Sequence, residues 1–175
     1  STDIAGLGDF AGTSITLGTA GAGAPTFDTG TLTFNSTGAV VIDEDSSMDI
    51  VGTNTAGGTG ADLDSTATID DSGATSIAVT GLADVNGVTG INLGAGGTFD
   101  ATTLTFNSTG TVVIAEDSGM DIVGVNTAGA GTSTFTSTGA ISDAGATSTT
   151  IGGLGDFAGT SITLGTAGGG APTFN

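Results

Sequence analysis

The stretch TLTFNSTG occurs twice in this chain of 175 residues, at positions 31–38 and again, letter for letter, at 103–110. Polar and apolar residues alternate through TLTF, and alternation with a period of two is typical of a β-strand. The NSTG that follows contains the small and polar residues that form tight turns. The octapeptide therefore predicts a short strand and a corner, which recur with a 72-residue period.

The same 72-residue offset relates most of the chain to itself, pairing positions 32–57 with 104–129 and 61–84 with 133–156. A further module, GLGDFAGTSITLG, occurs at 6–18, loosely at 81–94 and identically at 153–165. Fixed periods of this length indicate stacked repeats, in which each unit buries its apolar residues against its neighbours.

Three coils fit each 72-residue period when FNSTGAV at Phe34 is matched with LDSTATI at Leu63 and, more weakly, with VNGVTGI at Val85. Each coil then has three apolar sites, and all eight phenylalanines fall on the first or third of them. The residues that lead the coils are Phe10, Phe34, Leu63, Val85, Phe106, Phe135 and Phe157. Since no helical period appears, we predict an all-β fold: residues 1–175 form one parallel β-solenoid segment of about seven coils, with 21–29 residues and three short strands each.

The composition excludes several classes of partner. The chain has no Lys, Arg, His or Cys, and its 18 acidic residues give a formal charge of −18. Phosphate neutralisation needs cationic side chains, so neither nucleic acid nor an anionic membrane surface is expected as a partner. No apolar run is long enough to span a membrane. The absence of cysteine suits a long-lived extracellular protein.

The two ends of the sequence resemble each other, because residues 6–28 and 153–175 are nearly the same. The ends of a solenoid are open sheet edges that can pair with another chain, and natural solenoids cap them with atypical repeats. Neither end is atypical here, and no initiator methionine or signal peptide is visible. We therefore expect the segment to belong to a longer chain, or to join other copies of itself head to tail.

Catalysis is not expected. Without His, Lys, Arg, Cys or Tyr, only carboxyl groups remain for acid–base chemistry. The adjacent pairs Asp70–Asp71 and Glu44–Asp45 have the residue type that a glycosidase uses, but they read as ordinary acidic turns of a repeat.

Acidic residues also gather where strands are predicted to end, and stacked coils could bring their oxygen atoms together to bind Ca²⁺. No other cofactor is implied. The spacing is not that of an EF-hand, and a solvated acidic face that aids solubility explains the same residues. The candidate ligands are Asp43, Glu44, Asp45, Asp70, Asp71, Glu116, Asp117 and Asp143.

Threonine pairs of the form Thr-x-Thr begin at positions 31, 66, 103 and 134, and a flat threonine ladder on a solenoid can bind ice. In the predicted register Asp62 and Asp64 interrupt the column between Thr33 and Thr105. The preference of threonine for β-strands is therefore the simpler explanation.

The repeat LTFNSTGAVVIDEDSSMDIVGTNTAGG, with LDSTATIDDSGATSIAVTGLADVNG after it, resembles the tandem repeats of large bacterial surface proteins. These are the filamentous-haemagglutinin-like and β strand repeat adhesins. The resemblance implies a right-handed β-helix, export across the envelope, and a role as an extended stalk, fibre or adhesin. The first hypothesis is thus a structural, extracellular filament, stalk or sheath; the alternatives are an adhesin module and a Ca²⁺- or ice-binding solenoid.

Overall fold

The computed structural model describes residues 1–19, 26–143, 148–165 and 173–175. Within these ranges the chain forms twenty strands of a single sheet, the strand pairs are parallel, and there is no helix. Consequently, no helix in the described part of the chain has the length and apolar character to cross a membrane.

The first ten strands are β1 (Thr2–Gly12), β2 (Ile15–Leu17), β3 (Phe27–Ser36), β4 (Val40–Glu44), β5 (Met48–Ile50), β6 (Thr53–Ala56), β7 (Gly60–Ser65), β8 (Thr68–Asp71), β9 (Ser76–Gly87) and β10 (Gly90–Leu93). The remaining strands are β11 (Thr98–Asn107), β12 (Thr111–Glu116), β13 (Met120–Ile122), β14 (Val125–Ala128), β15 (Thr132–Ser137), β16 (Ala140–Asp143), β17 (Ser148–Ile151), β18 (Leu154–Ala158), β19 (Ser161–Thr163) and β20 (Thr173–Phe174).

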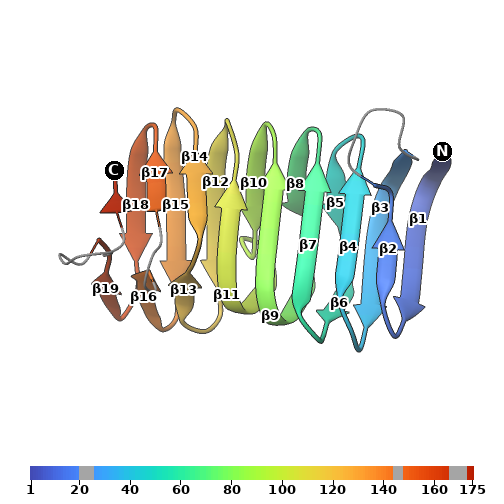
Figure 1. The fold of residues 1–175 in the computed structure, drawn as a ribbon, viewed down its shortest axis with the longest axis horizontal. Helices are drawn as coiled ribbons and strands as arrows, with labels where there is room; N and C mark the ends of the chain where they lie inside the picture. The colour runs from blue at the N-terminus through green and yellow to red at the C-terminus, as the bar shows by residue number, and fades with distance from the viewer. Residues whose placement is uncertain (20–25, 144–147, 166–172) are drawn as a thin grey trace.

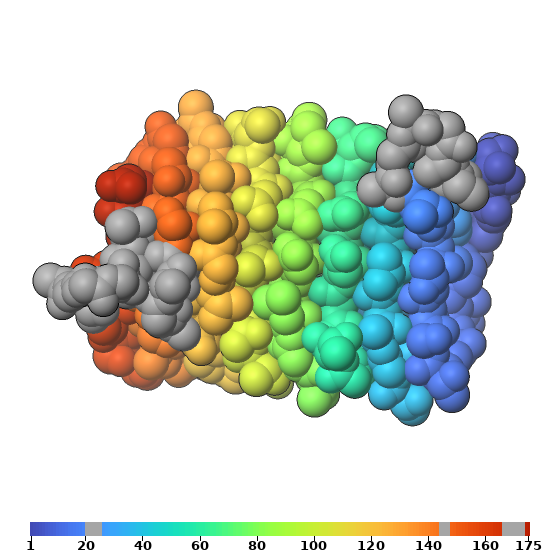
Figure 2. Space-filling view, viewed as in Figure 1, coloured from blue at the N-terminus to red at the C-terminus, as the bar shows by residue number. Residues whose placement is uncertain are grey.

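The strands wind into a rod along which the chain advances steadily from the N-terminus to the C-terminus (Figure 1). Each coil pairs with the next in parallel: β2 with β4, β4 with β7, and β7 with β9. The coils form successive bands of colour across the rod (Figure 2). The predicted all-β parallel solenoid of about seven coils is confirmed.

Alternation within the strands builds the core. In β3 the pattern Leu32-Thr-Phe34 buries the two apolar side chains completely and leaves Thr33 partly exposed. Further along the rod, the ring of Phe135 contacts those of Phe106 and Phe157, with centroids 5.0 Å and 4.8 Å away. Phe157 stacks on Phe135 in the next coil, whereas Phe106 reaches it from another column. Like side chains therefore stack on one another from coil to coil, and dispersion and aromatic contacts accumulate along the axis.

The predicted leading residues stack as expected in part of the rod. Phe34 lies on Phe10, Val85 on Leu63, Phe106 on Val85, and Phe157 on Phe135. These pairs confirm the predicted register within three separate stretches of the chain.

Between those stretches the predicted register is wrong. Leu63 stacks on Ile42 instead of Phe34, and Phe135 stacks on Ile114 instead of Phe106. The two 29-residue coils of the prediction do not exist, since Leu32 already pairs with Ile50, and Asn35 with Thr55. The number of residues from one strand to its paired strand in the next coil is smaller than 29 even where it is large, as between Thr2 and Phe27. The spacing of apolar residues does not predict this register, because the residue that follows Phe34 in its column is polar: it is the buried Asn54.

The 72-residue repeat consequently spans more than three coils, which corrects the predicted three. Three coil steps lead from Ile42 through Leu63 and Val85 to Phe106, whereas Ile114, the repeat equivalent of Ile42, lies further along the chain. Equivalent residues of the two repeats therefore do not share a column. Their local contacts are nevertheless the same, because Leu104 pairs with Ile122 as Leu32 pairs with Ile50.

Candidate functional site

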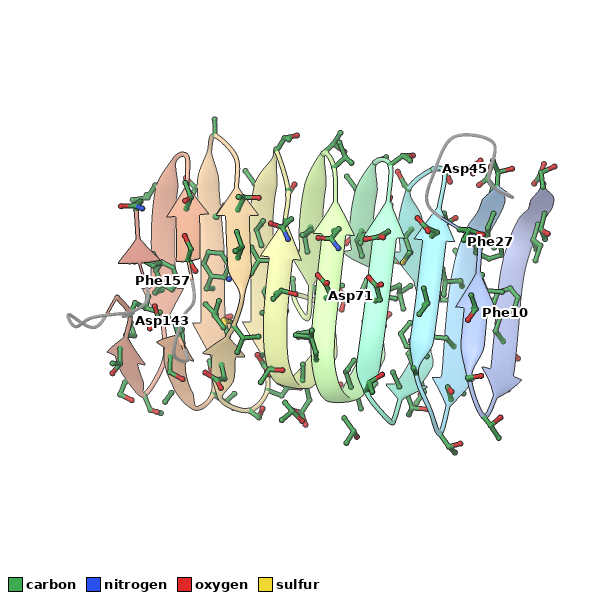
Figure 3. The ribbon with its side chains drawn as sticks, viewed as in Figure 1. Phe10, Phe27, Asp45, Asp71, Asp143 and Phe157 are labelled. Atoms are coloured by element: carbon green, nitrogen blue, oxygen red, sulfur yellow. The ribbon has the colours of Figure 1, made fainter. Side chains whose placement is uncertain are left out.

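Four of the eight predicted acidic residues point into the solenoid. Glu44, Asp71, Glu116 and Asp143 are at most 8% exposed, and each is the last residue of its strand. The alternation that buries the apolar residues of β4, β8, β12 and β16 also turns these final side chains inward. Figure 3 shows Asp71 near the middle of the rod and Asp143 near its C-terminal end.

Glu44 and Glu116 make matching contacts in the two repeats. Oε1 of Glu44 accepts a hydrogen bond from the Thr29 backbone N–H at 2.8 Å, and Oε1 of Glu116 accepts one from the Ala101 N–H at 3.0 Å. Oε2 of each side chain is buried and has no hydrogen-bond partner among the described residues. One oxygen of each carboxyl group thus joins distant segments of a repeat, while the other is enclosed without a donor from those segments.

Asp71 and Asp143 form a second matching pair. Oδ2 of Asp71 accepts a hydrogen bond from the Gly94 N–H at 2.8 Å, and Oδ2 of Asp143 accepts one from the Gly165 N–H at 2.9 Å. The Oδ1 atoms are buried and have no partner in the part of the chain that the structure describes. Each aspartate therefore satisfies a backbone amide at the corresponding corner of the next coil.

Burial raises the pKa of three of these carboxyl groups, those of Glu44, Asp71 and Glu116. The pKa of Glu116 rises to about 7 and that of Asp71 to about 6, chiefly because burial removes water from the charged form. Burial likewise raises the pKa of Glu44, against hydrogen bonds from Thr29 that lower it. These three groups therefore keep their protons to a higher pH than exposed carboxyl groups do, whereas Ca²⁺ binds the deprotonated carboxylate.

The other four predicted ligands lie on the outside. Asp45 and Asp117 are exposed, while Asp43 and Asp70 are partly exposed, and Oδ1 of Asp70 accepts a hydrogen bond from Asn92 Nδ2 at 2.7 Å. Figure 3 shows Asp45 near the upper edge of the rod and Asp71 near the middle of the view. No three His, Cys, Asp or Glu side chains in the described ranges converge to hold a metal ion. Calcium binding stays a prediction.

Asp43 and three aspartates that were not predicted as ligands, Asp62, Asp64 and Asp84, form an outward ladder across β4, β7 and β9. Asp62 pairs with Asp84, and Asp64 with Asp43 on one side and Asn86 on the other. The pKa of Asp62 rises to about 6, first through burial and then through repulsion from its acidic neighbours. Asn86 Nδ2 donates to Asp64 Oδ1 at 2.7 Å and to Asp84 Oδ1 at 3.2 Å. Unneutralised carboxylates stacked in a parallel sheet therefore repel one another here.

Two buried asparagines, Asn54 and Asn126, were not predicted from the sequence to be structurally important. Oδ1 of Asn54 accepts a hydrogen bond from the Phe34 N–H, and Oδ1 of Asn126 from the Phe106 N–H, both at 2.9 Å. Their Nδ2 groups donate to the carbonyl oxygens of Val51 and Val123. The sequence does contain a pattern that could have predicted their burial. Alternation in TNTA and VNTA turns the asparagine to the same inward face as the alanine.

The predicted threonine pairs do not form a continuous ladder in the described ranges. Thr33 Oγ1 donates to Asp9 Oδ1, and Thr105 Oγ1 to Asp84 Oδ1, both at 2.8 Å. Aspartates thus interrupt these threonine columns. These pairs do not form a flat threonine face among the described residues, and ice binding stays a prediction.

The two ends of the rod are open edges. Within the described residues, β1 pairs only with β3 and β2 only with β4, while β18 pairs only with β15 and β19 only with β16. Leu7 at one end is 55% exposed, and Leu154 at the other is 66% exposed. Residues 1–28 and 148–175 are identical at 24 of 28 positions, so both edges carry the same coil.

Comparison with known proteins returned no matching family model, no matching curated protein and no matching solved structure. The geometry of the rod and of its two open edges is therefore the basis for the functional proposal.

Proposed function

We propose that this protein is a structural one: a β-solenoid segment of an extracellular filament, stalk or sheath, which assembles by end-to-end stacking of its coils. In this proposal the surface-protein resemblance supplies the extracellular setting, and the partner of the chain is another copy of itself. The protein has no catalytic role.

The observation that carries the proposal is the pair of open edges with the same coil. An unpaired parallel edge presents a row of backbone donors and acceptors that another strand can satisfy. A contact between opposite ends is head to tail, and because it does not close on itself it generates an open filament. Stability adds up coil by coil in such a rod, so a junction between copies resembles any internal interface.

The alternatives have less support. An adhesin needs an exposed patch or an irregular insertion for its target. Phe174 at 36% is the most exposed phenylalanine among the described residues, and it lies on the last strand, where stacking would cover it. The acidic ladder across β4, β7 and β9 favours a solvated surface over a docking site.

Electron microscopy tests the proposal. Negative-stain images over a range of protein concentrations should show rods of uniform width whose length grows with concentration, and dilution should shorten them. Light scattering on the same samples should report the same growth. Discrete short rods that stay monomeric at the highest concentration would contradict the proposal.

A further inference from the structure

The repeated octapeptide TLTFNSTG contains an N-x-T sequon, at residues 35–37 in the first repeat and at residues 107–109 in the second. This pattern accepts sugars on the asparagine amide nitrogen in secreted proteins. No other asparagine of the chain has a serine or threonine two residues after it. Since the two octapeptides are identical, any difference between the sequons comes from the coils against which they lie.

The coil that follows each sequon makes the same contact with it. Asn35 in β3 and Asn107 at the end of β11 are both partly exposed. Oδ1 of Asn35 accepts a hydrogen bond from Thr55 Oγ1 at 3.3 Å, and Oδ1 of Asn107 accepts one from Thr127 Oγ1 at 3.1 Å. The following coil therefore does not distinguish the two asparagines.

The coil that precedes Asn107 holds its amide nitrogen. Asn107 pairs with Asn86 of β9, and its Nδ2 donates to Asn86 Oδ1 at 3.0 Å. Nδ2 of Asn86 donates in turn to Oδ1 of Asp64 and of Asp84. Hydrogen bonds to ionised carboxylates are stronger than those between neutral groups. The Asn107 side chain is thus fixed through its nitrogen by Asn86 and through its oxygen by Thr127.

The coil that precedes Asn35 leaves its amide nitrogen free. Asn35 pairs with Ala11 of β1, whose methyl group accepts no hydrogen bond, and Asn35 Nδ2 has no partner among the described residues. The Thr37 hydroxyl likewise has none there, whereas Thr109 Oγ1 donates to the Val88 carbonyl at 2.6 Å. The amide nitrogen and the hydroxyl that define a sequon are therefore free in the first repeat and engaged in the second.

We propose that Asn35 is a site of N-linked glycosylation on the folded protein and that Asn107 is not. The donor is a sugar activated by a phosphate group at its anomeric carbon, such as a nucleoside diphosphate sugar. Nδ2 of Asn35 forms a bond to that carbon while the bond from the carbon to the phosphate oxygen breaks. The phosphate leaves with the electron pair, and a base of the transferase takes the amide proton. This modification is independent of the filament function.

Transfer at Asn107 has to break contacts that Asn35 lacks. A transferase must lift the sequon side chains off the sheet, which in the second repeat breaks the hydrogen bonds from Asn107 to Asn86 and from Thr109 to Val88. Because loss of each such bond slows the step several-fold, transfer at Asn35 should be at least about tenfold faster. A sugar on Asn35 would lie beside the exposed, small side chain of Ala11.

Sugar transfer to the full, folded chain tests the proposal. The protein is incubated with UDP-glucose and a soluble asparagine glucosyltransferase that recognises N-x-T, and is then digested with a protease that cuts before aspartate. Residues 28–42 and 100–116 are released as separate peptides, each with one sequon. Mass spectrometry should find the hexose on residues 28–42 well before it appears on residues 100–116. Synthetic peptides of the two sequences, which lack the neighbouring coils, should react at similar rates.

Exchange of the preceding neighbour provides matched controls. Ala11→Asn gives Asn35 the neighbour that Asn107 has, so transfer at Asn35 should slow. Asn86→Ala removes the acceptor of Asn107 Nδ2, so transfer at Asn107 should accelerate while that at Asn35 stays the same. Transfer at Asn107 that equals or exceeds that at Asn35 in the folded, unmodified chain would overturn the proposal. So would an unreactive Asn35 in a chain whose peptide reacts, or an unchanged rate at Asn35 in Ala11→Asn.

Discussion

At the scale of single residues, the solenoid encloses carboxyl groups that lack a cationic partner. Since the chain has no Lys, Arg or His, these groups rely on backbone N–H donors and on protonation. Glu116 shows the balance most clearly: one oxygen accepts the Ala101 N–H, the other has no partner among the described residues, and burial raises its pKa to about 7. The neutral acid is thus the form that suits the core.

Stability should therefore fall as the pH rises. The folded protein keeps a proton on Glu116 up to about pH 7, whereas the unfolded chain releases it near the ordinary value of 4.5. The stabilisation is complete below pH 4.5 and is lost as the pH rises through 7. A shift of this size corresponds to about 3 kcal/mol in the free energy of unfolding.

Glu116→Gln tests this dependence, because glutamine resembles the neutral acid at every pH. Urea unfolding at a series of pH values should show a smaller loss of stability between pH 4.5 and 7 in the variant than in the unmodified protein. Asp117→Asn, at the exposed neighbouring position, should keep the full dependence. Equal slopes in Glu116→Gln and the unmodified protein would show that Glu116 does not titrate as inferred.

At the scale of strands, each coil is held by the coils above and below it. Alternation in the sequence correctly predicted which side chains of β3 face inward, because a strand has a strict period of two. It did not predict the neighbour of Phe34, since Asn54 is polar and its burial depends on hydrogen bonds to Phe34 and Val51. The corner glycines show a similar dependence: a Cβ on Gly57 would overlap the Thr37 carbonyl oxygen of the coil beneath.

Phe135→Ala should remove a buried ring that contacts two other phenylalanine rings. The side chain is fully buried between Phe106 and Phe157, so truncation should lower the free energy of unfolding by about 3–5 kcal/mol. Phe174→Ala, on the partly exposed last strand, should lower it by less than about 1 kcal/mol. Urea unfolding of both variants measures the difference, and equal losses would contradict the inferred importance of these buried ring contacts.

At the scale of the whole molecule, the rod has a strong charge of one sign and two complementary ends. Its formal charge of −18 makes two copies repel each other as they approach. The inward acids, Glu44, Asp71 and Glu116, contribute less to this repulsion because burial raises their pKa values. Exposed aspartates on the outer surface, such as Asp45 and Asp117, belong to the charge that two copies present to each other.

Added salt should therefore promote assembly. Raising sodium chloride from about 20 mM to about 300 mM shortens the screening length from roughly 20 Å to about 6 Å, which weakens repulsion between copies. Light scattering at fixed protein concentration should increase, and the concentration at which filaments appear should fall. Potassium chloride should act equally. A fall in scattering with salt would indicate that attraction between charges, rather than edge pairing, drives association.

The sequence by itself determined the strands, the corners and the solenoid, because period-two alternation and a faithful repeat leave few other ways to bury so narrow a core. It also determined that both ends carry the same coil. Only the tertiary structure decided the register, in which Leu63 stacks on Ile42 and the repeat exceeds three coils. Register depends on how many residues each corner takes up and on buried polar groups such as Asn54, and these are settled by contacts between coils.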